Sequence, residues 1–571
     1  MNFFIKNGNI LDNILLQLIN VVLILWVFYY SPIDYECDAA NTLETSKYIY
    51  HTIFTNEAVS PSWSYRAPLY KLIQIVSGTF FFDSFKPIVF TQIIFSILMP
   101  SFFYFTLFHI NRRFALLGSI IFILSLIPII HLKLILSVHS MIFFLVLSNF
   151  FLVKFVYKKN ISDFYFAFIT SLMVMMTRFD GTFIFLGQAL ILSYYLFKTK
   201  LEIKLKLKHL LKAYSVVVIT MLFWMTLKAT FILKVSNPVQ FIQSFASLNH
   251  QSGAQLYWSV NNGMRNDINT KYSNQIGSDR YIDNLLVLSN GPASKKLYNY
   301  LTKFFEKEGI IDHLSFFEDK MLPISIIEKK ENSPSKIYYD HFEKFFDDPK
   351  KIADNVFNEE FESYHYPLII PALLETFYGK SITDKLLLGA SYEIILSNKD
   401  IKDMILKKYY DAYGSLNKLI FLRTLKYPNP KKNNSWYNLE TFDSANCASN
   451  SLSPKMFDEY ENQYNKNSNK PNSNLIEKIS STHRHIIRNF VGPLILIFLI
   501  FIFFTKYFFL VLVLFASYNV TLIFMSVMAS GVVHRKSEAY TLVLGILILI
   551  FLLSGFKNFL KWSFKILKIN K

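Results

Sequence analysis

The sequence predicts an all-α polytopic membrane protein of about ten transmembrane helices with a large and mostly helical non-cytoplasmic insert. Of its 571 residues, 52% are hydrophobic and 18% are charged, with 58 Phe and 34 Tyr. A water-soluble chain of this length would struggle to keep so much apolar surface from water. Apolar runs that can cross a hydrocarbon core of about 30 Å, which takes about 20 helical residues, recur in two blocks.

These runs give ten predicted spans. They are, within a few residues, 12–30, 87–108, 114–131, 134–156, 163–178, 181–198, 211–233, 489–504, 506–529 and 539–556. No small-residue cleavage site follows the first run, which is therefore interpreted as an anchor and not as a signal peptide. The chain then divides into an N-terminal membrane block, residues 1–235, an insert, residues 236–488, and a C-terminal membrane block, residues 489–571.

The distribution of lysine and arginine predicts the orientation. With a cytoplasmic N-terminus, nearly every predicted inside loop is basic, as in residues 198–209. The C-terminus is then cytoplasmic too, and the first outer loop, residues 31–86, and the whole insert lie outside. Within that loop, residues 69–82 are apolar but short, which favours a re-entrant or interfacial helix. The basic loops on the inner side thus account for the net charge of +18. The sequence has no stripe of basic residues with interleaved aromatic residues, which nucleic-acid binding would require.

The insert is long enough for a core of its own. Amphipathic patterns predict helices at residues 348–364 and 382–408, and residues 462–474 form a polar low-complexity linker. It contains no P-loop, GxSxG or HExxH motif. The two cysteines of the chain, Cys37 and Cys447, exclude a disulfide framework and a CxxC metal site but leave a single bridge open.

Ionisable residues at the outer ends of predicted spans are the first candidates for function, because burying one at membrane depth costs about 2.5–3.5 kcal/mol. Asp34, Glu36 and Asp38 follow the first span, and Arg66 comes later in the same loop. A carboxylate here could deprotonate a hydroxyl, and an arginine could bind a phosphate with two hydrogen bonds. The alternative is a solvated loop without function.

Two further clusters lie at short outer turns. Arg178 and Asp180 stand in the sequence TRFDG between two predicted spans, where an ion pair that only caps two helices is the alternative. Lys133, Ser137 and His139 come at the start of the fourth span. A histidine in such a place is more often a packing residue than a functional one.

The last cluster, His534, Arg535, Lys536 and Glu538, separates the final two spans. Three consecutive basic residues on the outer side run against the positive-inside rule. They indicate an anionic ligand, with contact to lipid headgroups as the alternative.

The order of these motifs resembles the GT-C superfamily of membrane glycosyltransferases, family 39-like, the branch with protein O-mannosyltransferases and aminoarabinose transferases. Two family patterns, D-x3-Y-x3-A-K and R-x-P-L-Y, are similar to segments of the first outer loop. The matching residues are Asp38, Thr42, Ser46 and Lys47, then Arg66, Pro68, Leu69 and Tyr70. Thr42 replaces the tyrosine of the first pattern.

Three more patterns contribute to the resemblance. The turn TRFDG is similar to the small-residue–arginine turn of the family, with Phe179 in place of its proline. The family segment G-x-x-L-Y-x-G-N-N is matched by Gly253, Leu256, Tyr257, Asn261 and Asn262. The pair His534–Arg535 resembles a basic or aromatic pair near the family's last spans. The acidic residue of the family at the start of the fourth span has no counterpart, since Val138 and His139 stand there.

The resemblance implies transfer of a sugar from a polyprenyl-phosphate donor to an acceptor hydroxyl, with inversion, on the non-cytoplasmic face. Asp38 or Asp34 would be the general base. The donor phosphate would bind to Arg66, Arg178, His534, Arg535 and Lys536. The acceptor side would be lined by His139, Asp180, Tyr257, Asn261 and Asn262. No metal ligands are assigned and no cofactor is certain, while a divalent cation, Mg or Mn, stays an open alternative. The acceptor is a glycan, a lipid or a protein, and membrane lipids surround the chain.

Two other classes of function remain open: a transporter or flippase of a lipid-linked or anionic substrate, and a non-catalytic membrane assembly protein. Against transport, the sequence has no paired hydropathy repeat and no matching broken helices in two halves. An enzyme predicts that Asp38→Asn abolishes turnover in a folded protein, whereas an assembly protein predicts that Asp38 is dispensable. The residue usage, rich in Lys, Asn, Ile and Phe, is typical of an AT-rich genome and favours a bacterial inner (plasma) membrane.

Overall fold

The computed structural model describes most of the membrane blocks and parts of the insert. The described residues are 2–30, 37–55, 67–126, 129, 132–133, 135, 137–227, 256–257, 260, 289–307, 380–413, 452–468, 487, 489–528 and 539–569. Within these ranges all regular structure is helical and no strand occurs. The prediction of an all-α protein is confirmed for this part of the chain.

The chain forms two compact units. Unit 1 contains Met1–Lys234, Tyr410–Leu522 and His534–Lys571, and unit 2 contains Val235–Tyr409 and Ile523–Val533. Both predicted membrane blocks therefore contribute most of their residues to unit 1, which also includes the last part of the predicted insert. Each unit is described by itself.

Six helices in the described residues are long and apolar enough to cross a membrane: Ile10–Tyr29, Lys86–Ile110, Val138–Lys158, Ile203–Trp224, Phe508–Val527 and Thr541–Ile566. Four shorter apolar helices are Phe114–Leu124, Ile161–Thr177, Thr182–Phe197 and Asn489–Phe504. Every predicted span overlaps one of these helices. The sequence prediction of a multi-pass membrane protein therefore agrees with the structure, with six of the predicted spans in helices of spanning length.

The helices of unit 1 pack mainly with their neighbours in the sequence. The longer apolar helices that lie wholly or mostly in this unit are, in chain order, α1 (Asn2–Tyr30), α4 (Lys86–Ile110), α5 (Arg112–Leu124), α7 (Val138–Lys158), α8 (Ile161–Thr177), α9 (Thr182–Phe197), α10 (Ile203–Leu227), α27 (Phe508–Met528) and α29 (Ile546–Ile569). The connection from α7 to α8 shows why such pairs are antiparallel. Lys159 ends α7 in the left-handed region with φ 58°, and the side chain of Asn160 caps α8 by accepting a hydrogen bond from the Ser162 N–H at 3.2 Å. Two residues thus reverse the chain.

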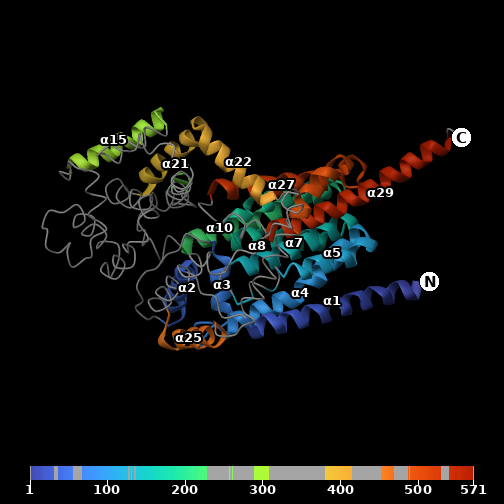
Figure 1. Ribbon diagram of the computed structural model, residues 1–571, viewed down its shortest axis with the longest axis horizontal. Coiled ribbons are helices and arrows are strands. Elements are labelled where there is room, and N and C mark those ends of the chain that lie inside the picture. The colour runs from blue at the N-terminus through green and yellow to red at the C-terminus, as the bar shows by residue number, and fades with distance from the viewer. Residues whose placement is uncertain are drawn as a thin grey trace, which may run out of the picture. The chain divides into compact units, whose positions relative to one another are not determined.

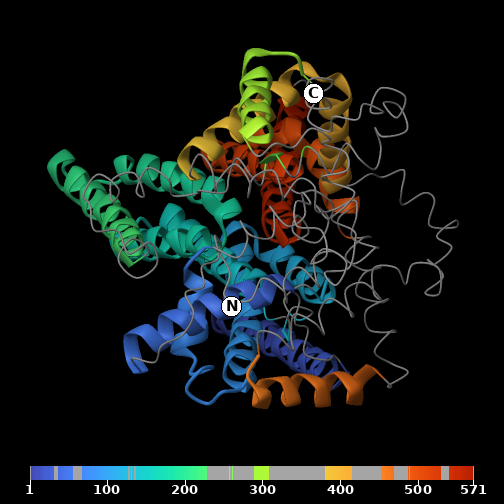
Figure 2. The same cartoon turned by 90° about the vertical axis from the view of Figure 1, so that its left-hand side faces the viewer.

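The N-terminus and the C-terminus of the chain lie at one end of the helices of unit 1. The helices α2 (Cys37–Tyr50), α3 (Leu69–Val76) and α25 (Pro454–Ser468) lie at the other end (Figure 1). We refer to the latter as the α2–α3 end; Figure 2 turns it toward the viewer, with α25 in orange at its edge. Glu459 fixes α25 there, because its Oε2 accepts hydrogen bonds from Ser84 Oγ at 2.7 Å and from the Phe85 N–H at 3.1 Å, just before α4 begins. Lys455 adds a hydrogen bond from Nζ to the Phe82 carbonyl at 2.9 Å.

Unit 2 contains α15 (Pro292–Lys307), α21 (Lys380–Ser397) and most of α22 (Lys399–Tyr413). The helix predicted at 382–408 is divided between α21 and α22 at Asn398, whose side-chain Oδ1 accepts a hydrogen bond from the Asp400 N–H at 3.0 Å and so starts a new helix. The helix predicted at 348–364 is outside the described residues. Part of the linker predicted at 462–474 is helical, because α25 continues to Ser468.

Candidate functional site

The structure describes some of the predicted site residues. The side chains of His139, Arg178, Asp180 and Tyr257 are described, and Asp38 is the second residue of α2. The remaining candidates lie outside the described residues: Asp34, Arg66, Asn261, Asn262, His534, Arg535 and Lys536. Tyr257 belongs to unit 2, where it is buried with a side chain 1% exposed. The other described candidates all belong to unit 1.

Arg178 and Asp180 form the ion pair that the TRFDG turn predicts. Arg178 Nε lies 3.0 Å from Asp180 Oδ1, and Nη2 lies 2.9 Å from Oδ2. The backbone fixes both residues: the Arg178 N–H donates to the Val174 carbonyl at 3.2 Å to end α8, and Asp180 lies in the 3-10 turn Phe179–Gly181. Both side chains are largely buried, so this two-point hydrogen-bonded pair is a fixed feature and not a loose surface contact.

Tyr540 lies beside this pair, and no sequence pattern had singled it out. Its side chain is fully buried, and its hydroxyl lies close enough to Asp180 and Arg178 for the charges of both to act on it. Tyr540 directly precedes the π-helical turn Thr541–Gly545 that leads into α29, and it follows His534, Arg535 and Lys536 by four to six residues. The structure therefore brings the arginine turn after α8 next to the start of the last helix.

A second group of buried polar side chains connects the two motifs of the first outer loop. Ser46 Oγ of α2 donates a hydrogen bond to Gln74 Oε1 of α3 at 2.7 Å, and both side chains are fully buried. Tyr70 of α3 accepts from Gln92 Nε2 of α4 at 3.3 Å. Burial raises the pKa of the Tyr70 hydroxyl, which is therefore neutral at physiological pH. The motif residues Ser46 and Tyr70 thus belong to one packed polar cluster.

His139 extends this cluster into the helices of unit 1. Its Nε2 lies 2.9 Å from the Gln92 carbonyl and 3.2 Å from Ser96 Oγ. A carbonyl can only accept, so Nε2 carries the proton, and Nδ1 is a buried acceptor with no hydrogen bond from any described residue. His139 is fully buried, and its position inside the helices is that of a hydrogen-bonded packing residue.

Lys71 is a second residue that the sequence analysis missed. This side chain of α3 is fully buried, and its Nζ lies 5.6 Å from the ring centroid of Trp224 on α10. The helix α3 also packs against α2 and α8. The helix α2, which contains Asp38, and the helix α8, which is followed by Arg178, are therefore both neighbours of α3. A lysine in the apolar segment LYKLIQIV was the signal that could have identified it.

The described residues include no group of three or more His, Cys, Asp or Glu side chains that could hold a metal ion. Comparisons with protein families, with characterised proteins and with solved structures found no match. The functional argument therefore depends on the residues of this chain alone.

Proposed function

We propose that the protein is a membrane glycosyltransferase of the GT-C type, which moves a sugar from a polyprenyl-phosphate donor to an acceptor hydroxyl. The observation that carries this proposal is the position of α3. It is bonded to α2 through Ser46 and Gln74, and it packs against α8, which ends at Arg178. The helix that contains Asp38 and the helix that precedes the arginine turn, which are far apart in the sequence, thus both pack against one short helix.

Asp38 is the proposed general base, with Asp34 as the alternative carboxylate. Asp38 comes two helical turns before Ser46 on α2, and the buried Ser46 hydroxyl holds that helix on α3. A base held in place by a packed helix can take the proton of the acceptor hydroxyl as the oxygen attacks the anomeric carbon. A single displacement of this kind inverts the configuration of the sugar.

Arg178 is the proposed ligand of the departing phosphate. Negative charge grows on the phosphate as the sugar leaves, and a fixed guanidinium stabilises this charge more in the transition state than in the ground state. Asp180 holds the guanidinium through two contacts, and Tyr540 stands beside it with a hydroxyl that can donate to the same oxygen. We assign Arg66, His534, Arg535 and Lys536 to the same anionic group.

The acceptor completes the proposal. A glycan, lipid or protein would approach from the non-cytoplasmic side, where the insert lies in the proposed topology. Asp180 is the proposed acceptor-side residue of unit 1, and Asn261 and Asn262 are proposed acceptor-side residues of the insert. His139, which is enclosed by the helices, is left out of this proposal. The proposed location is the inner membrane of a bacterium, with both termini in the cytoplasm.

A turnover assay tests this function. Purified protein is mixed with radiolabelled polyprenyl-phosphate sugars and a crude acceptor extract, beside Asp38→Asn, Asp34→Asn and Arg178→Ala. Loss of the general base is expected to lower turnover by about 10²–10⁴-fold, and loss of Arg178 by about 10²–10³-fold. Asp458→Asn, an exposed carboxylate on α25, is the matched control and should keep full activity. Product from the Asp38 and Asp34 variants at the wild-type rate would remove the proposed base.

Transport is the second candidate, because a polar seam runs between α1 and α4. Gln17 Nε2 donates to Ser101 Oγ at 2.6 Å, Asn20 Nδ2 donates to the Ser96 carbonyl at 3.0 Å, and Tyr104 Oη donates to Asp12 Oδ2 at 2.9 Å. Polar residues at membrane depth often mark a substrate path, although they also join helices. Flux of a lipid-linked sugar into proteoliposomes without any covalent product would favour this candidate over the transferase.

A further inference from the structure

Exposed lysines gather at the point where α9 is followed by α10. Residues 194–214 contain six lysines and one acidic residue, Glu202. Five of these lysines are exposed, two in the turn and three in the first turns of α10: Lys198, Lys200, Lys204, Lys208 and Lys212. The sixth, Lys206, donates a hydrogen bond from Nζ to the Phe197 carbonyl at 3.0 Å and so closes the turn. The turn therefore presents a fixed and strongly basic surface.

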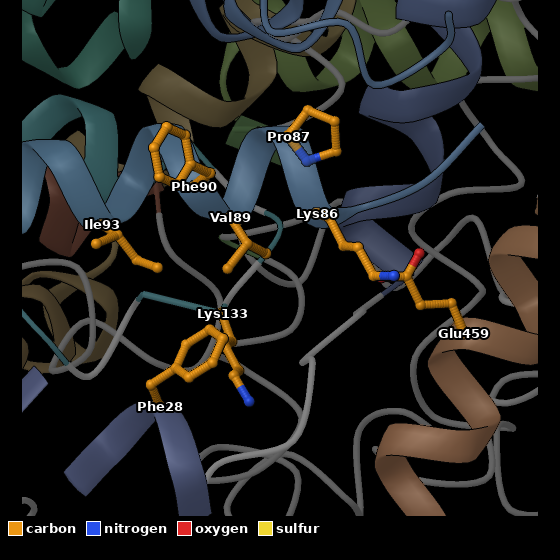
Figure 3. A pocket seen from close by; sticks show the side chains of 8 residues that line it. All are labelled: Phe28, Lys86, Pro87, Val89, Phe90, Ile93, Lys133 and Glu459. Carbon is orange, nitrogen blue, oxygen red and sulfur yellow. The ribbon is translucent and has the colours of Figure 1, made fainter. Parts of the chain in front are cut away.

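Two other lysines of unit 1 lie close to a carboxylate. Lys154 Nζ lies 2.8 Å from Asp163 Oδ1. At the α2–α3 end, Lys86 and Glu459 line the same cavity of about 440 Å³ (Figure 3). A charge with a countercharge beside it in the protein attracts an external anion less. Because residues 194–214 contain a single carboxylate, their surface keeps a net positive charge along its own length.

The packing of α10 decides which way these lysines face. His209 Nδ1 lies 2.7 Å from Tyr165 Oη of α8, and Ala213, which is 1% exposed, is covered on the same side of α10. At 3.6 residues per turn, Lys204 lies on the side opposite Ala213. The next two exposed lysines follow at intervals of four residues and so lie on the same flank of the helix. We refer to the three as the lysine column of α10: Lys204, Lys208 and Lys212.

An exposed apolar stripe runs beside the lysine column. Ile203 is 63% exposed, Leu207 is 51% exposed and Leu211 is 73% exposed, again at intervals of four residues. The stripe continues toward the other end of α10 with Val218, which is 56% exposed. A soluble polyanion would leave this stripe in water, whereas a lipid offers a charged headgroup and a hydrocarbon chain to adjacent parts of one surface. The surface therefore fits lipid.

The position of the lysine column along α10 matches the depth of the headgroups. Residues 213–227 contain no charged residue and are about 22 Å long, which is less than a hydrocarbon core of about 30 Å. Lys212 can nevertheless reach the headgroup layer, because a lysine extends its ammonium group along the helix toward water. Lys208 and Lys204 lie about 6 Å and about 12 Å further out along the helix axis. The column therefore crosses the headgroup layer at this end of unit 1.

We propose that the lysine column, together with Lys198 and Lys200 of the preceding turn, binds the headgroups of anionic phospholipids in the adjacent leaflet. The phosphates lie against the ammonium groups, and the acyl chains lie along Ile203, Leu207 and Leu211. Lysine binds phosphate as a point charge and needs no fixed bidentate geometry. The bound lipids hold α10 at a fixed depth in the bilayer. The proposed transfer reaction uses none of these residues, so either proposal can fail alone.

The test compares an anionic with a zwitterionic phospholipid. The full-length protein in a neutral detergent is titrated with phosphatidylglycerol or with phosphatidylcholine of the same acyl chains, and bound lipid is counted by native mass spectrometry. The wild type should bind phosphatidylglycerol at least about tenfold more tightly, because several lysines act on its net negative charge. The triple variant Lys204→Met, Lys208→Met and Lys212→Met should reduce this preference to about threefold or less, since methionine keeps an apolar stem and removes the charge. An unchanged preference in this variant would overturn the proposal.

A triple variant on another helix controls for the loss of three positive charges. Lys295, Lys296 and Lys303 are exposed lysines of α15 in unit 2, and changing all three to methionine should leave the preference at about tenfold or more. An equal loss in this control would show a general attraction of anionic lipid to basic residues and would contradict the proposal. Heparin, a polyanion without acyl chains, is the competitor. If it displaces phosphatidylglycerol at a concentration of negative charge about tenfold lower, the surface belongs to a soluble polyanion and not to lipid.

A measurement on the wild type guards against a triple variant that does not fold. Phosphatidylglycerol with a photoreactive group near its headgroup is bound to the unchanged protein and irradiated, and the crosslinked peptides are identified by mass spectrometry. Crosslinks within residues 198–214 support the proposal. Crosslinks confined to other segments would place the bound lipid elsewhere and refute it.

Discussion

Lys159 occupies a partly buried position that disfavours its charged form. It ends α7 with φ 58°, its Nζ lies 4.1 Å from the ring centroid of Tyr195, and burial lowers its pKa to about 8 from the usual 10.5. Between these two values the unfolded chain binds a proton that the folded chain has released. Stability therefore rises with pH across this window, and the contribution is lost as the pH falls through about 8.

The prediction concerns the difference between wild type and Lys159→Met. Thermal unfolding in detergent is followed from pH 7 to pH 10.5, and the wild type should gain melting temperature relative to the variant as the pH rises. Lys158→Met, an exposed neighbour, controls for loss of a positive charge at this end of the helix. Parallel curves for the wild type and Lys159→Met would contradict the assigned pKa.

Residues close in the sequence were predicted better than residues brought together by folding. The pair Arg178–Asp180 could be inferred because only one residue, Phe179, separates its members in the sequence. Tyr540 lies 360 residues further on, and no local pattern indicates that it stands beside this pair. For His139 the prediction gave a polar residue at the start of a span, but its partners on α4 depend on how α4 and α7 pack.

The contact between α15 and α21 depends on a cap that comes from another helix. Glu393 of α21 accepts hydrogen bonds from the Ala293 N–H at 3.2 Å and from the Ser294 N–H at 2.7 Å, at the first turn of α15. These N–H groups have no partner within their own helix. Burial raises the pKa of Glu393, but the hydrogen bonds from Ser294, Ala293 and Ser289 together lower it below 4.5.

We predict that Glu393→Gln weakens this cap. The local stability of α15 should fall by about 1 kcal/mol, so amide hydrogen exchange in its first turn should be about fivefold faster. In the wild type the stabilisation is present above pH 4.5 and is lost as the pH falls through the lowered pKa. Asp403→Asn on α22 is the matched control. Unchanged exchange in Glu393→Gln would show that the cap carries no stability.

Element boundaries were harder to predict than element type. The amphipathic pattern at 382–408 continues past Asn398, and only the side-chain cap of that residue shows where one helix ends and the next begins. The segment from Asn462 is polar enough for a linker, yet α25 extends to Ser468, since Glu459 and Lys455 hold the start of this helix against the turn before α4. Tertiary contacts therefore override local composition at both places.

At the scale of the whole molecule, the membrane blocks could be predicted because their signal is local. A run of apolar residues is sufficient to indicate a helix in a bilayer, whatever its neighbours are. Each predicted span accordingly overlaps an apolar helix. No local pattern in the sequence indicates that α25, which was predicted as part of the insert, belongs to unit 1. This assignment depends on contacts such as that of Glu459 with Phe85, 374 residues apart.

The orientation of unit 1 gives the last prediction. Lys204 lies at the start of α10, after α9 has led the chain over 16 residues, about 24 Å, away from the turn that contains Asp180. Lys455 lies on α25 at the α2–α3 end. The basic residues around Lys204 favour the cytoplasmic side, so Lys455 should face outward. In a background with Cys37 and Cys447 changed to serine, Lys455→Cys should react with a membrane-impermeant maleimide on intact cells, and Lys204→Cys should react only after the cells are opened. Labelling of both positions on intact cells would contradict the proposed crossing pattern, and the reverse order would place the candidate site in the cytoplasm, where a lipid-linked sugar presented on the outer face could not reach it.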